Sequence, residues 1–193
     1  WMTEAHNPIK RKFTTEDLEP LLHEAGISHT LVVQTWSSIE ETEAFLSFAG
    51  KTSFIAGVVG WIDFTKDVAP QIERLMDHPH ACYLKSLRHQ VHDEPNADWL
   101  TDRRVQAGFA ALKRFGLSYD LLIRTREIPA AISCAKKFPE QKFIVNHIAK
   151  PRIASGWDDD WDNKISRLAN YRKNVWIKLS GLVTEADWKT WKE

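Results

Sequence analysis

The chain has 193 residues, of which 43% are hydrophobic and 27% are charged, a composition typical of one folded globular domain. Lys and Arg together number 26, as do Asp and Glu, and the resulting net charge of zero argues against a nucleic-acid partner. No apolar run reaches the roughly 20 residues of a membrane span, and Cys82 and Cys134 predict no disulfide framework, so we expect a cytoplasmic protein without a membrane partner.

The predicted elements alternate along the chain. A first helix is expected between Thr14, a hydroxyl N-cap, and Gly26, which marks its C-terminus. Six short apolar segments then predict strands, at residues 30–36, 54–61, 81–89, 119–124, 143–147 and 174–180. Each strand is followed by a segment with a helical pattern, at residues 38–50, 67–76, 98–115, 128–138, 164–171 and 185–192.

This alternation predicts an α/β fold with a parallel sheet. The strand starts are roughly 25 to 35 residues apart, which is the length of a βαβ crossover. An open doubly wound sheet and a (β/α)8 barrel both fit the pattern, but no Gly-x-Gly-x-x-Gly follows a strand. Because a barrel needs about 250 residues and eight strands, we expect an incomplete (β/α)8 barrel of the TIM-barrel type. It would contain about six of the eight strands and occupy residues 1–193 as a single domain, truncated at both ends.

Polar residues gather where the predicted strands end, and in a parallel barrel these ends form the catalytic face. His147 follows the buried run 143–145 and is the candidate catalytic residue, because a neutral imidazole can accept a proton or donate to an oxyanion. Side chains alternate along a strand, so Arg88, Gln90 and His92 would share one side while the backbone stays extended. Taken singly, Asp63, Arg124 and Lys178 are more simply explained as salt-bridged or capping residues.

The residues alone provide no set of metal ligands at a strand end. His78 and His80 have the spacing of a His-x-His pair, but they flank Pro79 in a helix-to-strand loop at the opposite end of a barrel. No Gly-x-Ser-x-Gly elbow supports a serine nucleophile. The residues therefore leave both the metal requirement and the reaction type open.

Five motifs together carry a resemblance that extends over the whole chain in the right order. They are Ile55-Ala-Gly-Val-Val-Gly-Trp-Ile-Asp63, Arg88-His-Gln-Val-His-Asp-Glu-Pro95, Tyr119-Asp-Leu-Leu-Ile-Arg124, Phe143-Ile-Val-Asn-His-Ile-Ala-Lys-Pro151 and Lys178-Leu-Ser-Gly-Leu-Val-Thr-Glu-Ala-Asp-Trp188. In this combination the sequence resembles the amidohydrolase-2 family, in the sugar-lactonase branch that includes L-fuconolactonase-like and L-rhamnonolactonase-like enzymes. The resemblance implies a (β/α)8 barrel that hydrolyses cyclic esters of sugar acids.

The resemblance also implies roles for the candidate residues. His147 matches the family's active-site His after the sixth barrel strand. Arg88 matches a position that contacts a substrate carboxylate in the pyrone-dicarboxylate lactonases, a role that suits the planar, bidentate guanidinium. The substrate contacts that we expect are Trp61, Arg88, Gln90, His92 and Arg124.

Two features of the family are missing from this sequence. The family's first strand carries a His-x-His pair and its eighth strand an Asp that acts as general base, and neither lies in the 193 residues. The implied mechanism is attack of water on a lactone carbonyl, which His147 polarises directly or through a divalent metal such as zinc. Members of the branch differ in needing a metal. Because the loss of a catalytic base costs on the order of 10²- to 10⁴-fold in rate, we expect no turnover from the 193 residues alone.

Two other interpretations stay open at this point. The chain could be a catalytically silent barrel homologue that binds a ligand or a partner, or it could be an unrelated open α/β sheet. For the leading interpretation, the expected partner is a small-molecule lactone. The unpaired edges of an incomplete sheet also favour a homo-oligomer.

Overall fold

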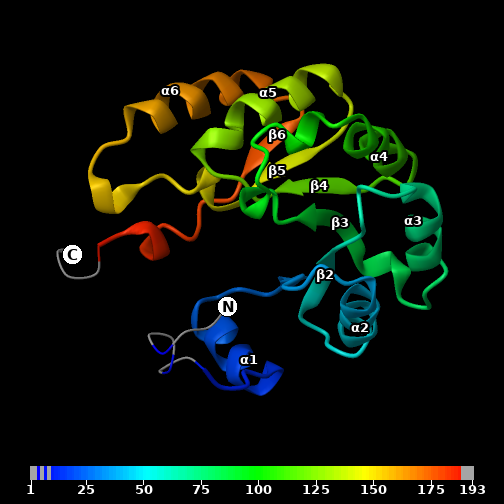
Figure 1. Ribbon diagram of the computed structural model, residues 1–193. Helices are drawn as coiled ribbons and strands as arrows, with labels where there is room; N and C mark the ends of the chain where they lie inside the picture. Colours follow the sequence, from blue (N-terminus) through cyan, green and yellow to red (C-terminus); the bar gives the residue numbers. More distant parts are fainter. Residues whose placement is uncertain (1–3, 5–6, 8–9, 188–193) are drawn as a thin grey trace.

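The structure, a computed structural model, describes residues 4, 7 and 10–187. Six parallel strands form one sheet, in which their order in space is their order along the chain (Figure 1). The strands are β1 (Thr30–Val33), β2 (Ile55–Gly60), β3 (Leu84–His89), β4 (Ser118–Leu121), β5 (Phe143–Val145) and β6 (Val175–Ile177). The sheet curls into part of a cylinder, which is the arrangement predicted for an incomplete (β/α)8 barrel.

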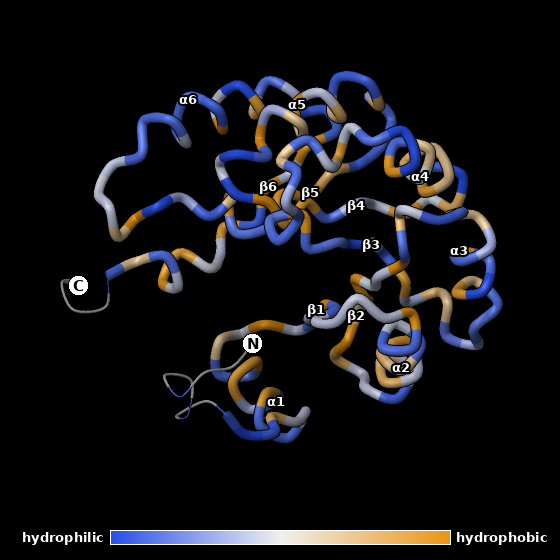
Figure 2. The backbone as a smooth tube through the Cα atoms, viewed as in Figure 1, coloured by the Kyte–Doolittle hydropathy of each residue, from blue (hydrophilic) through white to orange (hydrophobic). Residues whose placement is uncertain are grey.

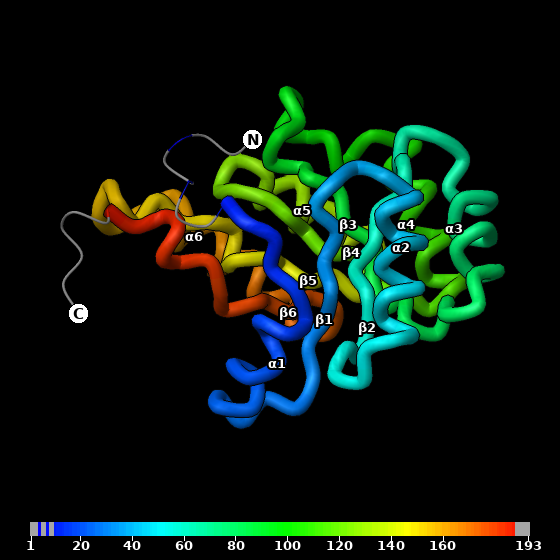
Figure 3. The backbone as a smooth tube through the Cα atoms, turned by 90° about the horizontal axis from the view of Figure 1, so that it is seen from below, coloured from blue at the N-terminus to red at the C-terminus, as the bar shows by residue number. Residues whose placement is uncertain are grey.

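Helices fill the connections between the strands and lie on the outside of the curl (Figure 1, Figure 3). They are α2 (Ile39–Ala49), α3 (Val68–Met76), α4 (Arg103–Arg114), α5 (Ile128–Lys137) and α6 (Asp159–Leu168), whereas α1 (Thr15–Glu24) precedes β1. Because neighbouring strands are parallel, their carboxyl ends all lie at one end of the sheet. The loops that lead from strand to helix therefore collect at that end, where the candidate residues are found.

An aromatic cluster fixes which face of the sheet is turned toward the helices. Phe109 of α4 packs edge-on against Tyr119 of β4 and Phe143 of β5, with ring centroids 4.9 and 5.4 Å apart. All three side chains are buried, and Figure 2 shows further hydrophobic positions in β5, β6 and the neighbouring α5. Since side chains alternate along a strand, Asp120 and Ile144 face the inside of the curl.

Gly60 brings helix α2 close to the end of β2. A Cβ at this position would lie 2.3 Å from Cγ2 of Thr42, so only glycine fits here. The close approach allows Thr42 Oγ1 to accept a hydrogen bond from the backbone N–H of Trp61 at 2.8 Å. The contact holds the backbone of Trp61 at the carboxyl end of the sheet.

Two predicted helices begin at other residues than expected. The segment 98–115 is not one continuous helix, because Trp99–Thr101 forms a separate 3₁₀ turn and α4 begins only after its N-cap, Asp102. Helix α6 begins at residue 159 instead of 164, because Asp158 is its N-cap and acidic residues occupy its first turn. Acidic side chains stabilise a helix N-terminus, so the run of Asp before residue 161 is a start signal.

The strands are shorter than predicted, because their ends pass into loops. For example, β3 begins at Leu84 after a 3₁₀ turn at Ala81–Tyr83. The predicted helix at residues 185–192 falls mostly outside the described residues, and within them Val183–Glu185 forms a 3₁₀ turn. The assignment of residues 1–193 to a single domain stays a prediction.

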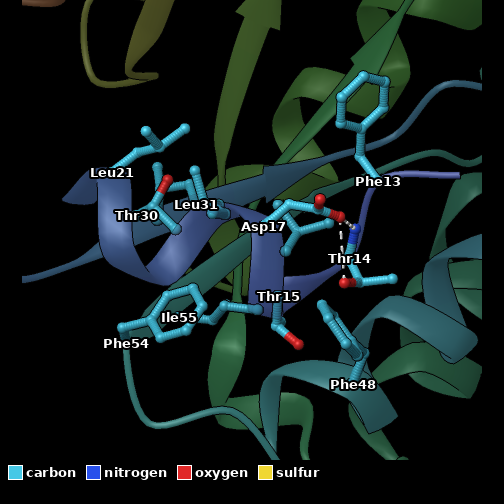
Figure 4. Close-up of a pocket in the computed structure, with 12 residues that line it drawn as sticks. Phe13, Thr14, Thr15, Asp17, Leu21, Thr30, Leu31, Phe48, Phe54 and Ile55 are labelled. Carbon is cyan, nitrogen blue, oxygen red and sulfur yellow. Dashed lines mark hydrogen bonds between the residues drawn. The ribbon is translucent and has the colours of Figure 1, made fainter. Parts of the chain in front are cut away.

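An apolar hollow of about 390 Å³ lies at the amino ends of β1 and β2 (Figure 4). Phe13, Leu21, Leu31 and Phe48 contribute to its lining. Asp17, also drawn in Figure 4, accepts a hydrogen bond from the backbone N–H of Thr14 at 2.7 Å. This hollow is at the opposite end of the sheet from the strand-to-helix loops.

Candidate active site

Asp120 is the centre of a polar cluster inside the curl of the sheet. Its side chain is fully buried. Its carboxylate accepts hydrogen bonds from the Ser86 hydroxyl at 2.6 Å, from the Asn146 amide at 2.9 Å and from the ammonium group of Lys178. A buried carboxylate is tolerated only when it is paired and hydrogen-bonded. These contacts tie the carboxyl halves of β3, β4, β5 and β6 together.

Arg88 crosses the interior from β3 and contacts the ends of two other strands. Its Nη1 donates to Asn146 Oδ1 at 3.0 Å, and its Nη2 donates to the backbone carbonyl of Gln34, which follows β1. Its Nε is buried and has no hydrogen-bond partner among the described residues. Burial lowers the pKa of Arg88, and the charge of Asp120 acts in the opposite direction. The guanidinium nevertheless stays charged at neutral pH.

His147 lies directly after β5, at the carboxyl end of the sheet, as predicted. It begins a left-handed turn of non-glycine residues with positive φ angles: His147 (52°), Ile148 (44°), Ala149 (60°) and Lys150 (50°). The left-handed conformation costs an L-residue roughly 1–2 kcal/mol. The turn therefore depends on contacts with the surrounding elements.

Contacts with α6 and with the segment after β6 hold this turn in place. The backbone N–H of Ile148 donates to the carbonyl of Lys178 at 3.2 Å, and the Ile148 carbonyl accepts from the Trp161 indole at 2.8 Å. Lys150 forms an ion pair with Glu185 at 2.6 Å. The position of the His147 imidazole is thus fixed by its neighbours.

The environment of His147 keeps its imidazole neutral. Burial lowers its pKa, and the positive charges of Lys150, Arg88 and Lys178 lower it further. Because an ordinary His has a pKa of about 6.5, this ring is uncharged at pH 7. Its Nδ1 lies 3.0 Å from the Ser180 hydroxyl, while its Nε2 makes no hydrogen bond with a described residue.

Gln90 lies on the same side as Arg88, as the alternation predicts. Its side-chain amide pairs with that of Gln34 at 3.2 and 3.3 Å, and Gln34 Nε2 also donates to the carbonyl of Arg88 at 3.3 Å. The hydroxyl of Ser37 donates to Gln90 Oε1 at 3.2 Å. These contacts join the loop after β1 to the loop after β3.

His92 does not continue the alternation of Arg88 and Gln90, because the backbone does not stay extended beyond β3. Val91–Asp93 forms a 3₁₀ turn, which carries His92 toward the following loop. The Nε2 of His92 lies 3.2 Å from a carboxylate oxygen of Asp93, whereas its Nδ1 is buried and has no partner among the described residues.

Charges near Arg124 and near His147 act on the pKa of His92. Burial lowers its pKa, Asp93 opposes this shift, and the charges of Arg124 and Lys150 lower the pKa further. Lys150 acts on both His92 and His147, so both rings lie within its field. Arg124 is exposed and forms no ion pair with a described residue, which leaves its guanidinium accessible to a ligand.

Trp61 forms a hydrogen bond with His89, a residue that is not among the predicted site residues. The Trp61 indole N–H donates to His89 Nδ1 at 3.1 Å. Since an indole only donates, Nδ1 is the acceptor and the ring proton is on Nε2, which donates to Glu94 Oε1 at 2.6 Å. His89 also stacks on Trp99, with ring centroids 4.4 Å apart. The indole N–H of Trp61 is thus occupied within the protein.

The sequence and the fold match a known protein family. The model of the amidohydrolase family matches residues 2–193. The chain belongs to the amidohydrolase family. An L-fucono-1,5-lactonase of Burkholderia ambifaria is 37% identical over 187 residues, and one of Burkholderia multivorans is 30% identical over 195 residues. These matches include 96% and 98% of this chain but 63% and 64% of the relatives, so the chain spans less than two thirds of their length.

Solved amidohydrolase structures share the same arrangement of strands and helices. A Burkholderia multivorans amidohydrolase crystallised with bound zinc has 29% sequence identity and a TM-score of 0.89. That match covers 98% of this chain and 66% of the other. A second structure of a Burkholderia multivorans amidohydrolase, with bound HEPES, has 28% sequence identity and a TM-score of 0.88. The predicted barrel type is therefore confirmed.

The described residues of this amidohydrolase do not fit a metal centre by themselves. Among them, no three His, Cys, Asp or Glu side chains lie close enough together to hold an ion. The positive charges of Lys150, Arg88 and Lys178 act on the imidazole of His147 and disfavour a further cation nearby, and only Glu185 acts in the opposite direction. The carboxylate of Asp120 already pairs with Lys178. We assign no chemical step to a metal.

Sequence patterns alone do not single out three residues of the amidohydrolase site. Asp120 carries a usable signal, because a carboxylate inside a buried strand must have a partner. Lys178 has the salt bridge that its pattern favours, but its partner is this central carboxylate. Ser180 is a polar residue at the end of the predicted strand 174–180, but its contact with His147 depends on the left-handed turn and is not predicted by the sequence. Asp63 has the ordinary role predicted for it, an ion pair with a neighbouring lysine at 3.1 Å.

Proposed function

We propose that this amidohydrolase chain contributes the carbonyl-polarising side of a lactone hydrolase, in which water attacks the ester carbonyl of a sugar-acid lactone. The observation that carries the proposal is the neutral His147, whose Nε2 has no described partner and which lies in the field of Arg88 and Lys178. The relatives named L-fucono-1,5-lactonase support the substrate class. The residue roles that follow are part of the proposal.

His147 would act on the carbonyl oxygen through Nε2. When the Ser180 hydroxyl donates to Nδ1, the ring proton is on Nε2. Nε2 can then donate a hydrogen bond to the carbonyl oxygen, and this bond strengthens as the oxygen becomes an oxyanion. A neutral imidazole is the form that this role requires, which agrees with the lowered pKa of His147.

The cations around His147 would stabilise the same developing charge. The Arg88 guanidinium is held by Asn146, and the Lys178 ammonium is held by Asp120. Because both groups are fixed before a ligand arrives, they need little reorganisation when negative charge develops. They also suit the carboxylate of the aldonate product.

The described residues do not provide the base for the attacking water. Asp120 is fully buried and already accepts hydrogen bonds from three side chains. The family resemblance assigns the base to an Asp that the 193 residues do not include. We therefore propose that this polypeptide binds aldonolactones without turning them over.

Binding and hydrolysis measured together test this proposal. Calorimetric titration with a panel of aldonolactones should give binding that His147→Ala weakens by about tenfold, the effect expected when a good hydrogen bond is lost. His23→Ala, which removes an exposed His of α1, is the matched control and should leave affinity unchanged. A pH-indicator assay should show no hydrolysis above the spontaneous rate.

Different outcomes contradict different parts of the proposal. If no aldonolactone binds, or if His147→Ala binds as tightly as the wild type, the lactonase assignment is wrong. A catalytically silent homologue that binds another ligand would give the first of these results. Lactone opening that disappears in His147→Ala would instead show that the 193-residue polypeptide has its own base.

The remaining interpretations concern partners and location. None of the helices in the described ranges is both long and apolar enough to cross a membrane. The cytoplasmic location, the homo-oligomer and the lack of a nucleic-acid partner stay predictions.

A further inference from the structure

A cavity of about 540 Å³ opens between the loop after β1 and the loop after β3. Because β2 lies between these two strands in the sheet, the cavity is above the carboxyl end of β2. Trp36 lines it from the first loop, and His89, Gln90, Asp93 and Glu94 line it from the second. Its size is typical of sites for small molecules.

The wall formed by Trp36 combines a fixed backbone with an exposed indole. The carboxylate of Glu41, in the first turn of α2, accepts hydrogen bonds from the backbone N–H groups of Thr35 at 2.9 Å and Trp36 at 3.0 Å. The neighbouring Ser37 hydroxyl donates to Gln90 of the other loop at 3.2 Å. Yet the Trp36 side chain is 69% exposed. A large flat aromatic surface is thus held at the cavity by an ordered loop.

The opposite wall presents oxygen acceptors on a loop that is also held in place. Arg126 donates to the backbone carbonyls of Glu94 and His92, which ties this loop to the 3₁₀ turn that precedes α5. Glu94 Oε1 accepts from His89, and its Oε2 makes no hydrogen bond with a described residue. Asp93 is exposed beside it. The wall therefore offers carboxylate oxygens with free lone pairs.

These groups suit a neutral, polyhydroxylated ligand. A Trp face packs against the apolar C–H face of a sugar ring, and carboxylate oxygens accept strong hydrogen bonds from hydroxyl groups. Two carboxylates on one wall would repel a carboxylate on the ligand. The chemistry of the cavity thus favours a sugar and disfavours a dicarboxylate.

A chain of hydrogen bonds connects the cavity with the proposed reaction centre. Gln90 in the cavity wall pairs with Gln34, the carbonyl of Gln34 accepts from Arg88, and Arg88 donates to Asn146 next to His147. The cationic side with His147 and the acidic, aromatic side with Trp36 therefore belong to the same end of the sheet.

We propose that the Trp36 cavity, defined by Trp36, Gln90, Asp93 and Glu94, binds the hydroxylated part of a neutral sugar lactone and selects against dicarboxylate lactones. The proposal rests on the lactonase function proposed above, and it names the substrate class. Trp36 stacks on the ring, and Glu94 and Asp93 accept hydrogen bonds from its hydroxyl groups.

A neutral sugar that lacks a lactone carbonyl tests the cavity independently of His147. L-fucose is titrated into the 193-residue protein, and binding is followed by saturation-transfer NMR and by the indole resonance of Trp36. L-fucose should shift this resonance, whereas malonate, a dicarboxylate, should not. Trp36→Ala should weaken L-fucose binding by about tenfold. Glu94→Gln keeps an acceptor for His89 but removes the charge, and it should weaken binding to a smaller degree.

The control variant is Trp157→Ala, which removes an indole that is 75% exposed and lines a different cavity. It should leave L-fucose binding unchanged. Thermal unfolding curves that coincide with the wild type verify that each variant is folded. The cavity proposal is wrong if L-fucose does not bind, if folded Trp36→Ala binds it as well as the wild type, or if malonate binds at Trp36 as tightly as L-fucose.

The two proposals can fail separately. If aldonolactone binding depends on His147 but neither ligand depends on Trp36, the cavity proposal fails and the lactonase proposal stands. If L-fucose binding depends on Trp36 but no aldonolactone engages His147, the lactonase proposal fails and the cavity is a neutral-sugar site of another kind.

Discussion

The ammonium group of Lys178 donates a hydrogen bond to Asp120 and thereby joins the end of β6 to β4 across β5. The Asp120 side chain is fully buried, and that of Lys178 is 29% exposed. Ser86 and Asn146 fill other acceptor positions of the same carboxylate. The carboxyl ends of four strands are thus arranged around one charge pair, and Arg88 is attached to it through Asn146.

Replacing Asp120 with Asn tests the importance of this charge pair. Asp120→Asn keeps the size of the side chain but leaves the positive charge of Lys178 without a partner. Breaking a buried ion pair from one side costs about 3–5 kcal/mol. Urea unfolding should therefore show a loss of this order in the free energy of unfolding.

Asp160→Asn is the matched control, because Asp160 forms a surface ion pair with Lys164 at 2.7 Å. Exposed pairs of this kind contribute less than about 1 kcal/mol. Equal losses in the two variants would show that the cluster around Asp120 has no special role in stability.

Replacing Lys150 with Gln tests the electrostatics of both histidines. The charge of Lys150 lowers the pKa of His147 and of His92. Its removal should therefore raise both values, and NMR titration of the imidazole Cε1–H resonances measures them. Lys164→Gln, which removes a lysine of α6 from a surface pair, should raise neither. If Lys150→Gln leaves both pKa values unchanged, the proposed charge environment is wrong.

The lowered pKa of His147 also predicts a pH dependence of stability. Its folded-state pKa is below the ordinary value of about 6.5, so between these two values the unfolded chain binds a proton that the folded chain does not. The contribution of His147 to stability is therefore lost as the pH falls through this window. In His147→Gln, the free energy of unfolding should decrease less between pH 7 and pH 5 than in the wild type. An unchanged decrease would contradict the assigned shift.

The left-handed turn after β5 predicts an unusual effect of glycine. Ala149 is fully buried and has a φ of 60°. Ala149→Gly relieves an unfavourable backbone conformation and should leave the free energy of unfolding unchanged or raise it by up to about 1 kcal/mol. Ala131→Gly, at an equally buried position inside α5, should instead lower it by about 1 kcal/mol. Equal losses in thermal or urea unfolding would contradict the strained turn.

The order of the elements follows from local patterns, which explains why it can be predicted from the sequence. The run 143–145 is apolar on both faces, and it becomes a central strand between β4 and β6. The polar residue after such a strand must lie at the end of the sheet, so His147 is found where the pattern places it. The N-cap Asp158 is likewise a local signal, and it predicts the start of α6 correctly when it is taken into account.

Contacts between distant segments cannot be predicted in this way. The pairing of Asp120 with Lys178 requires that β4 and β6 flank β5 in a particular register. The position of His92 depends on a 3₁₀ turn that interrupts an apparently extended segment. Trp36 and Glu94 line one cavity only because the loops after β1 and β3 meet above β2. These contacts depend on the geometry of the sheet, which cannot be predicted from a single sequence by local patterns.

The lactonase proposal requires a neutral His147 that faces the ligand at the carboxyl end of the sheet. The most direct test is an NMR titration of the protein carrying ¹³C-labelled histidine with a saturating aldonolactone at pH 7. We predict that the His147 Cε1–H resonance shifts on binding while its ring stays in the neutral form, and that the resonance of the exposed His23 does not move. A His147 resonance that is unchanged at saturation, or that shows an imidazolium before or after binding, would contradict the claim.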